Sequence, residues 1–177
     1  MYYEIKTERL LLRPLGLGDL NTAHEYAGDE ENTRYMMRLP NATIAETAEF
    51  LTRVSEEWAR ALPMFYEFAI VTEGVHIGAI SVYLDDKRET GELGWILDKK
   101  YQGRGFATEA ALAVKDFARD VLRVKKLTAQ CDGENAPSYR LMRRIGLKLE
   151  SADGTRFYIK RNETASELTY SCTFSGN

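Results

Sequence analysis

The sequence holds few of the residues that build metal and redox sites. Among 177 residues there are two cysteines and two histidines. Cys131 and Cys172 lie far apart and form no CxxC pair, so we expect two reduced thiols and neither a zinc site nor a redox pair. His24 and His76 lack the partner spacing of a metal site or of a catalytic triad. The sequence therefore predicts a protein without a metal.

Long apolar runs and an excess of positive charge are also missing. No run reaches the ~18 apolar residues that a membrane span needs, and residues 1–6 lack the apolar core of a signal peptide. Lysine and arginine number 24 against 27 aspartates and glutamates, so no basic surface indicates nucleic-acid binding. We therefore expect a cytoplasmic protein that binds neither membrane nor nucleic acid.

Proline is scarce, and no repeat, low-complexity tract or linker divides the chain. Only four prolines occur, and they are scattered. Hydrophobic residues make up 44% and charged residues 29%, which is an ordinary globular balance. We expect one domain over residues 1–177, present as a monomer or a homodimer.

Hydrophobic periodicity and punctuation residues predict alternating strands and helices. Asp19 can cap a short helix, and Thr43 and Glu46 form a capping box before a helix that reaches Trp58. Asn135 caps a later helix that Gly146 ends. Strands are predicted at residues 9–14, 65–71, 77–84, 92–97 and 127–131, a helix at 106–121, and further strands near 156–160 and 168–174.

This order of elements predicts an α/β fold with a mixed sheet. The residues from 65 to 97 read as an antiparallel meander with a turn at Glu73 and Gly74. The helix between Leu97 and Leu127 makes the two flanking strands parallel neighbours through a right-handed crossover. A ligand is expected at the carboxyl ends of those two strands.

A glycine turn from Gln102 to Ala107 lies at that position. Gly103 and Gly105 lack a Cβ and let main-chain N–H groups approach a ligand, and the helix that follows adds its positive dipole end. Strand, turn and helix together predict a phosphate site. Thr108 breaks the dinucleotide-binding pattern, and the Gly-Lys-Ser or Gly-Lys-Thr of a P-loop is absent, which disfavours a nucleotide site. A plain turn without a ligand is the remaining alternative.

Two motifs of the chain resemble those of the GNAT acetyltransferase superfamily. Gln102, Gly105 and Ala107 match its acyl-CoA pyrophosphate motif, and Asn135 and Ser138 match its second motif. Residues 7–14, 91–95 and 101–110 resemble the branch that acetylates the N-termini of ribosomal proteins. The resemblance implies a mostly antiparallel mixed sheet with a splayed central parallel pair, flanked by helices.

The resemblance also implies the reaction, which is acetyl transfer from acetyl-CoA to a primary amine. The acceptor is a protein N-terminus or a small molecule. The resemblance implies that the pyrophosphate binds to the glycine turn, and that pantetheine runs beside the strand before the turn and reaches Asn135. The cofactor-binding residues are Trp95, Ile96, Leu97, Gln102, Gly103, Arg104, Gly105, Phe106, Ala107, Thr108, Asn135 and Ser138.

The catalytic residues are predicted to be Glu92 and Ser138. Glu92 lies on the strand beside the expected thioester, where a partly desolvated carboxylate can remove a proton from an amine, directly or through water. Many members of the superfamily protonate the CoA thiolate with a tyrosine, but the matching residue here is Met142, so we assign Ser138 as hydrogen-bond donor to that sulfur. A bulged strand is expected to supply an N–H to the oxyanion. The segment from Tyr35 to Met37 is a candidate border of the acceptor site.

Two other functions are weighed against acetyl transfer. A non-catalytic acyl-CoA-binding module keeps the phosphate site and does not need Glu92 or Ser138. A nucleotide-binding domain would bind ATP or NAD in competition with CoA.

Overall fold

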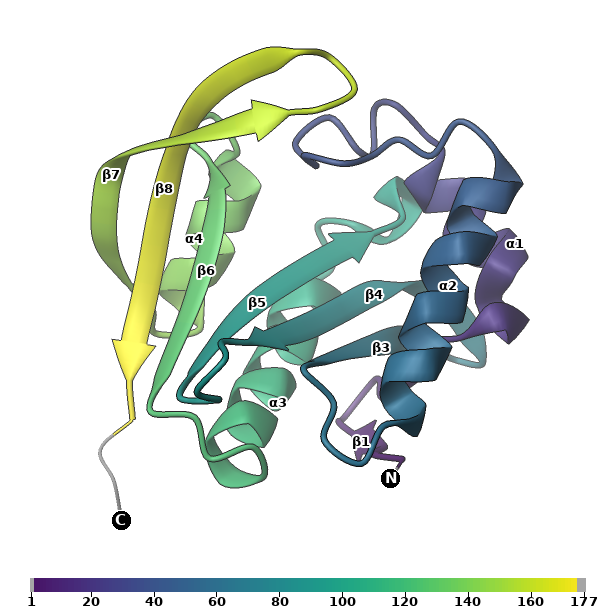
Figure 1. Cartoon of the computed structure of the whole chain (residues 1–177), viewed down its shortest axis with the longest axis horizontal. Helices are drawn as coiled ribbons and strands as arrows, with labels where there is room; N and C mark the ends of the chain where they lie inside the picture. The colour runs from purple at the N-terminus through teal and green to yellow at the C-terminus, as the bar shows by residue number, and fades with distance from the viewer. Residues whose placement is uncertain (1, 175–177) are drawn as a thin grey trace.

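Eight strands of the computed structural model join in one mixed sheet, and the structure describes residues 2–174. The helices are α1 (Leu20–Ala27), α2 (Ile44–Ala59), α3 (Phe106–Asp120) and α4 (Ala136–Arg144), with short 3-10 turns at Leu17–Asp19 and Lys99–Tyr101. The strands are β1 (Ile5–Lys6), β2 (Leu11–Pro14), β3 (Phe65–Thr72), β4 (Val75–Leu84), β5 (Thr90–Leu97), β6 (Lys126–Asp132), β7 (Lys148–Tyr158) and β8 (Glu163–Thr173). Their order in the sheet is β1-β2-β3-β4-β5-β6-β8-β7 (Figure 1).

The sheet opens between β5 and β6, the one parallel pair among the described strands. Their register runs from Thr90 opposite Lys126 to Leu93 opposite Ala129 and then stops, although both strands continue. Figure 1 shows the two strands diverging beyond this point. The predicted α/β fold with a splayed central parallel pair is therefore confirmed.

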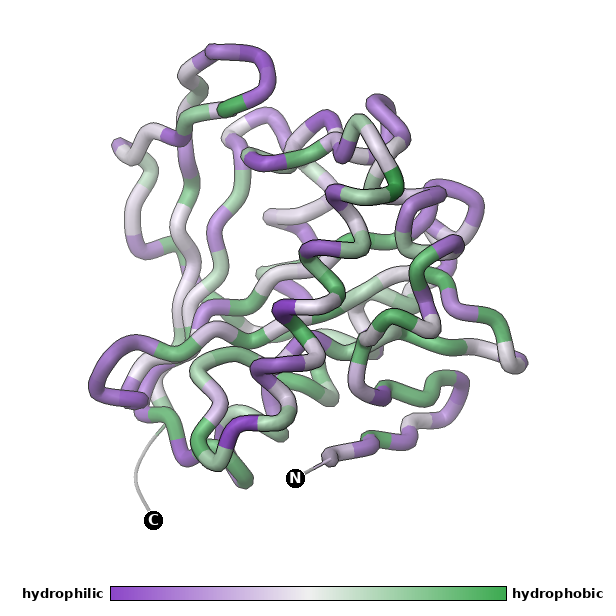
Figure 2. Tube along the Cα trace, turned by 45° about the vertical axis from the view of Figure 1, so that its right-hand side comes forward, coloured by the Kyte–Doolittle hydropathy of each residue, from purple (hydrophilic) through white to green (hydrophobic). Residues whose placement is uncertain are grey.

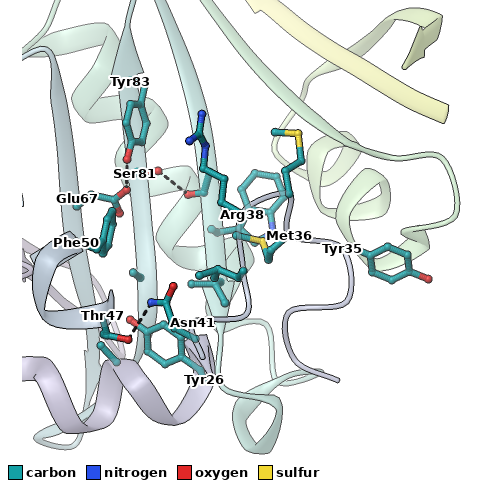
Figure 3. A pocket seen from close by; sticks show the side chains of 18 of the residues that line it. Tyr26, Tyr35, Met36, Arg38, Asn41, Thr47, Phe50, Glu67, Ser81 and Tyr83 are labelled. Carbon is teal, nitrogen blue, oxygen red and sulfur yellow. Dashed lines mark hydrogen bonds between the residues drawn. The ribbon is translucent and has the colours of Figure 1, made fainter. Parts of the chain in front are cut away.

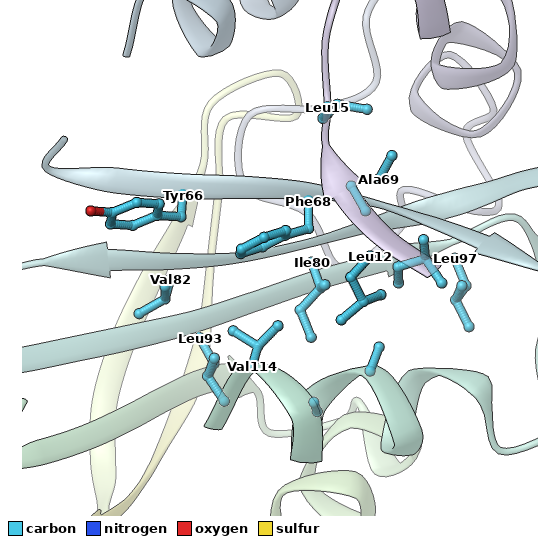
Figure 4. Packing of buried hydrophobic residues seen from close by; sticks show 14 of the residues in the cluster. Leu12, Leu15, Tyr66, Phe68, Ala69, Ile80, Val82, Leu93, Leu97 and Val114 are labelled. Carbon is cyan, nitrogen blue, oxygen red and sulfur yellow. The ribbon is translucent and has the colours of Figure 1, made fainter. Parts of the chain in front are cut away.

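The two faces of the sheet carry different side chains. On the face toward α3, Leu12, Phe68, Ile80 and Leu93 are buried and pack near Val114 of the helix (Figure 4). On the other face, the pleat places Glu67, Ser81 and Gly94 opposite one another across β3, β4 and β5. Figure 2 shows hydrophobic residues along the central strands and hydrophilic ones in the outer loops. One face thus builds the core, while the other carries polar groups.

Aromatic residues fasten both long helices to the sheet. Trp58 of α2 and Phe117 of α3 each contact Tyr66 and Phe68 edge-on, with ring centroids 5.2–5.4 Å apart. Tyr66 and Phe68, near the start of β3, therefore serve in packing. None of the helices described in residues 2–174 is long and apolar enough to cross a membrane.

Most turn and cap predictions are confirmed. Thr43 accepts a hydrogen bond from the amide of Glu46 at 3.3 Å, at the start of α2. Glu73 and Gly74 form the turn after β3 with φ values of 50° and 78°. Gly146 follows α4 with a φ of 85°, a left-handed conformation that glycine adopts easily.

Four predictions about elements need correction. The first predicted strand divides into β1 and β2, and β2 begins only at Leu11. The last two strands are longer than predicted, and β8 lies between β6 and β7. Asp19 precedes α1 but makes no side-chain cap, because its carboxylate binds Arg13 at 2.6 Å and 2.8 Å.

Candidate active site

The glycine turn is built by two residues in the left-handed region. Gly103 has a φ of 77°, and Gly105, which immediately precedes α3, has a φ of 83°. A Cβ on Gly103 would meet no atom within 4 Å, and one on Gly105 would lie 3.4 Å from Arg9. Glycine is therefore required here by backbone conformation more than by crowding.

The turn presents a row of unpaired backbone N–H groups. Within residues 2–174, no carbonyl or side chain accepts a hydrogen bond from the amides of residues 103–108. The first amide of this region that is bonded within the chain is that of Glu109, which donates to the carbonyl of Gly105 at 3.0 Å. Unpaired amides at a helix start, together with the helix dipole, fit an anionic group such as a pyrophosphate.

A brace from the N-terminal part of the chain holds this turn. Arg9 donates to the carbonyl of Arg104 at 3.0 Å, pairs with Glu109 at 2.7 Å and lies 4.7 Å over the ring of Phe106. The hydroxyl of Thr7 donates to Glu109 at 2.6 Å. Burial acts against ionisation of Glu109, but the hydrogen bonds from Thr7 and Arg9 outweigh it and lower its pKa. Sequence reasoning matched residues 7–14 to a family pattern but missed this contact.

The other predicted residues of the turn point in different directions. The side-chain amide of Gln102 donates to the carbonyl of Leu97 at 3.1 Å and ties the turn to the end of β5. The guanidinium of Arg104 is exposed and lies 5.5 Å over the ring of Tyr101. Gln102 therefore contributes scaffold contacts, and Arg104 has access to a ligand.

The start of α4 borders the open side of the splay. The side-chain oxygen of Asn135 accepts from the amide of Ser138 at 3.3 Å, which confirms the predicted cap. Both residues line the cavity described next. Met142 is fully buried, so position 142 faces the core and not the site.

A cavity of about 610 Å³ lies on the polar face of the sheet, beside the splay. Its walls come from α1, α2, β3 to β7, α4, the segment between α1 and α2, and the residues that follow β7 (Figure 3). Trp95 and Ile96 line it, and so do Tyr35, Met36 and Met37, as the sequence suggested. Leu97 does not line it. The predicted donor-side residues Trp95, Ile96, Asn135 and Ser138 therefore share one cavity with the segment from Tyr35 to Met37, whereas residues 102–108 lie outside its lining.

Glu92 lies on the cavity side of β5. It keeps contact with solvent. The surrounding walls raise the pKa of its carboxyl, the negative charge of Glu167 raises it further, and Arg156 acts in the opposite direction. A carboxylate with a raised pKa is a better proton acceptor near neutral pH than an ordinary glutamate.

Glu67 is a second carboxylate in this cavity, and sequence reasoning missed it. The residue is 7% exposed, and the hydroxyl of Tyr83 donates to it at 2.7 Å (Figure 3). Burial raises the pKa of Glu67 to about 7, against the lowering effect of hydrogen bonds from Tyr83 and Ser81. The signal in the sequence was a glutamate inside the apolar run of β3. Charged residues are rarely buried without a partner, and those that are often belong to functional sites.

The expected bulge for the oxyanion donor is not found in β5. The pairing of β5 with β4 runs without a shift from Gly78 opposite Leu97 to Leu84 opposite Gly91. In the neighbouring β3–β4 pair the register shifts between Ile70 and Val71, where β4 carries one extra residue, Ile77. Beyond Leu93 the backbone of β5 has no partner on the β6 side, so an open strand edge, not a bulge, leaves N–H groups available.

The thiols and histidines of the described residues do not form a second chemical centre. Cys131 lines the cavity, and burial raises its pKa to about 11, so it is a thiol at neutral pH. His76 contacts Thr22 at 2.7 Å and the carbonyl of Gly78 at 2.9 Å. Residues 2–174 contain no group of three or more metal-binding side chains.

The combination defines a class of protein. Unpaired amides at a helix start lie at the end of a splayed parallel pair, and carboxylates with raised pKa values lie across the cavity. This is the architecture of an acyltransferase whose donor carries phosphate groups. The model of the acetyltransferase (GNAT) domain family matches residues 9–148, and the chain belongs to that family.

Similar proteins agree with this assignment. An uncharacterized N-acetyltransferase of Bacillus subtilis, YnaD, is 30% identical over 148 residues, which are 82% of this chain and 83% of that protein. The spermidine N(1)-acetyltransferase of Escherichia coli K12 is 26% identical over 84% of this chain and 77% of its own length. The ribosomal L7/L12 alpha-N-protein acetyltransferase RimL, solved in complex with CoA, shares the fold with a TM-score of 0.84 at 17% identity, covering 97% of this chain and 98% of its own. The chain is therefore an N-acetyltransferase by family.

Proposed function

We propose that this protein transfers an acetyl group from acetyl-CoA to a primary amine by direct attack in a ternary complex, with residues 1–177 acting as one acyltransferase domain. The observation that carries the proposal is the row of unpaired amides at residues 103–108, which follows the carboxyl end of β5, one strand of the splayed pair. The acetyltransferase relatives support the same reaction.

Acetyl-CoA fits the donor side by the chemistry of its groups. The amides from Gly103 to Thr108 are suited to the pyrophosphate, with Arg104 available for a charge-assisted contact. The open backbone edge from Trp95 to Leu97 is suited to pantetheine, and Asn135 has a side-chain NH₂ to offer it. Phe106 and Ala107 contribute through their backbone.

Glu92 is proposed as the base. The amine must be neutral to attack, whereas an alkyl amine has a pKa near 10.4 and an α-amine nearer 8. The raised pKa of Glu92 and its place on β5 suit it to take the proton, directly or through water. Glu67 is a second candidate, but it lies two strands from β5 and is already bonded to Tyr83.

Ser138 is proposed to stabilise the departing CoA thiolate by donating a hydrogen bond. Ser138 lines the cavity. Within residues 2–174 its hydroxyl makes no hydrogen bond, so the hydroxyl is available to a ligand. Met142 lies in the core and cannot supply a proton there. A covalent acyl-cysteine route is disfavoured because the pKa of Cys131 is raised to about 11.

A non-catalytic acyl-CoA-binding module is the second candidate. The observation that favours it is methionine at position 142, where many members of the superfamily carry a tyrosine. It predicts tight CoA binding without turnover.

The test is thiol release from acetyl-CoA with a panel of amines and N-terminal peptides, beside calorimetric binding of CoA. Acetyl transfer predicts release that depends on the amine and an acetylated product of matching mass. CoA binding with no product from any amine would support the binding module, and absence of CoA binding would overturn both.

A further inference from the structure

Two arginines on the acceptor side of the cavity have no acidic partner. Arg38 lies in the segment between α1 and α2, and Arg53 lies on α2, yet both line the same cavity. Within residues 2–174, neither guanidinium lies within 4.0 Å of a carboxylate, and neither donates a hydrogen bond. Glu49 stands one helical turn from Arg53 but makes no such pair. Both side chains are exposed, and two unpaired guanidiniums at one cavity are suited to bind an anion.

The two arginines converge on Tyr83. Burial and Glu67 raise the pKa of the Tyr83 hydroxyl, while the positive charges of Arg53 and Arg38 both lower it, so both charges act at this hydroxyl. Figure 3 shows the side chain of Arg38 extending to the level of Tyr83. The anion receptor is therefore above β4, beside Tyr83.

The position of this receptor relative to Glu92 sets the size of the ligand. Tyr83 is the register partner of Glu92, so their Cβ atoms are about 5 Å apart. The Tyr83 hydroxyl reaches Glu67 on β3, one strand further, and strands are ~4.8 Å apart. A ligand with its amine at Glu92 and an anionic group at the arginines spans roughly 5–10 Å.

The remaining charges of the lining argue against a polycationic acceptor such as the spermidine of the Escherichia coli relative. Glu46 is already paired with Lys160 at 3.2 Å. Arg156 of β7, 9% exposed, also lines the cavity, and its positive charge lowers the pKa of Glu92. Four basic residues balance four acidic ones in the lining, namely Arg38, Arg53, Arg156 and Lys160 against Glu46, Glu49, Glu67 and Glu92. A second or third ammonium would meet unpaired guanidiniums.

We propose that the acceptor is a compact zwitterion, an amine that also carries a carboxylate or phosphate, and that Arg38 and Arg53 bind this anionic group. The proposal rests on the proposed function for the amine, but the anion site stands on its own geometry. 4-Aminobutyrate, short peptides and phosphorylated amines carry an amine and an anion at about this separation, whereas the α-amine and carboxylate of a free amino acid lie closer together.

The experiment compares acceptors that differ only in charge. Glycine, β-alanine, 4-aminobutyrate and glycylglycine are each assayed against their C-terminal amides, phosphoethanolamine against ethanolamine, and spermidine serves as the cationic arm. We expect kcat/KM to favour the best acid over its amide by about 10- to 100-fold, the range of one or two lost charge-assisted hydrogen bonds. The acid with the highest kcat/KM shows whether the site prefers a carboxylate or a phosphate, and which separation of amine and anion it prefers.

The variants assign this preference to the two arginines. In the double variant Arg38→Gln, Arg53→Gln, kcat/KM for the acid should fall about 10- to 100-fold through KM, while that for the amide changes less than about twofold. Arg60→Gln is the matched control, because it removes the same charge from the end of α2 outside the cavity lining. It should leave both acceptors unchanged.

Calorimetric binding of each acid and amide in the presence of CoA separates this inference from the proposed function. If no amine turns over but acids bind and the double variant loses that binding, the anion site stands and acetyl transfer to these amines falls. If amides or spermidine react as well as the acids, the anion site is wrong and acetyl transfer stands. Acids that neither react nor bind overturn the zwitterion assignment directly.

Discussion

The proposed donor side and the proposed acceptor side of this site are made in different ways. The donor side is a short, continuous piece of backbone, where Gly103 and Gly105 leave a row of amides unpaired. The acceptor side is a set of side chains from separate elements, among them Glu67, Tyr83 and Arg38. A backbone site depends on local sequence, whereas a side-chain site depends on the packing of distant segments. This is why one fold can keep its donor and change its acceptor.

The largest effect is expected from a substitution in the backbone of the glycine turn. Gly105→Val forces a β-branched residue into a φ of 83° and removes several amide contacts at once, so we expect CoA affinity to fall by at least about 100-fold. Calorimetry measures the affinity. Gly74→Val is the matched control, because Gly74 has a φ of 78° in the β3–β4 turn away from the site. Unchanged CoA affinity in a folded Gly105→Val protein would remove the phosphate assignment.

Removing the proposed base, Glu92, tests the proposed acceptor side without disturbing the proposed donor side. Glu92→Gln keeps size and hydrogen bonding but loses basicity, so the rate at neutral pH should fall by about 10²–10⁴. It should recover partly at high pH, where the free amine loses its proton unaided, while acetyl-CoA affinity hardly changes. A pH–rate profile of both proteins decides this. A profile identical to that of the wild type would place the base elsewhere, and Glu67→Gln is then the next variant to measure.

Ser138, at the start of α4, lies between the proposed donor side and the proposed acceptor side. Ser138→Ala tests whether its hydroxyl takes part in the reaction. If the hydroxyl donates to the thiolate, kcat should fall by roughly 10- to 1,000-fold with little change in the KM for acetyl-CoA. The cap of α4 comes from Asn135, so helix stability should be retained. Because kcat also changes from one acceptor to another, the wild type and the variant are compared with the same acceptor. Wild-type turnover in Ser138→Ala would remove serine from the mechanism.

The smallest expected effect concerns stability, and it distinguishes a buried carboxylate from a solvated one. Because the native pKa of Glu67 is about 7, the folded protein holds this proton more tightly than the unfolded chain. The contribution of this protonated carboxyl to the free energy of unfolding is complete below pH ~4.5 and is lost as the pH rises through about 7. As the pH rises through this window, the free energy of unfolding of Glu67→Gln should therefore increase relative to that of the wild type, by about 1–3 kcal/mol at pH 8. Denaturant unfolding at pH 5 and pH 8 measures this difference, and an equal difference at both pH values would contradict a raised pKa.

Much of the fold and of the donor side was predictable because the signals are local. The glycine turn, the cap by Asn135 and the crossover between Leu97 and Leu127 each depend on neighbouring residues. The splay then follows from where the parallel pairing ends at Leu93. The placement of β8 between β6 and β7 was not predictable, since no periodicity states which strands will pair.

The acceptor side was only partly predictable. Glu92 and the segment from Tyr35 to Met37, which the sequence proposed for the site, line the cavity, but Glu67 was hidden within a strand that looked like core. Its role appears only when Tyr83, from the next strand, donates to it. Arg38 and Arg53 gave no signal because exposed arginines are common, and only their shared cavity gives them meaning.

The brace of the glycine turn has a consequence for the order in which the molecule assembles. The turn is local, but Arg9 and Glu109, which hold it, are 100 positions apart. Closing a loop of that size has an entropic cost that local helix formation does not have. A nascent chain can therefore form α3 early and still lack a competent donor pocket until its first ten residues have docked. Anything that occupies those residues, such as a fused tag or a chaperone, would delay cofactor capture without unfolding the domain.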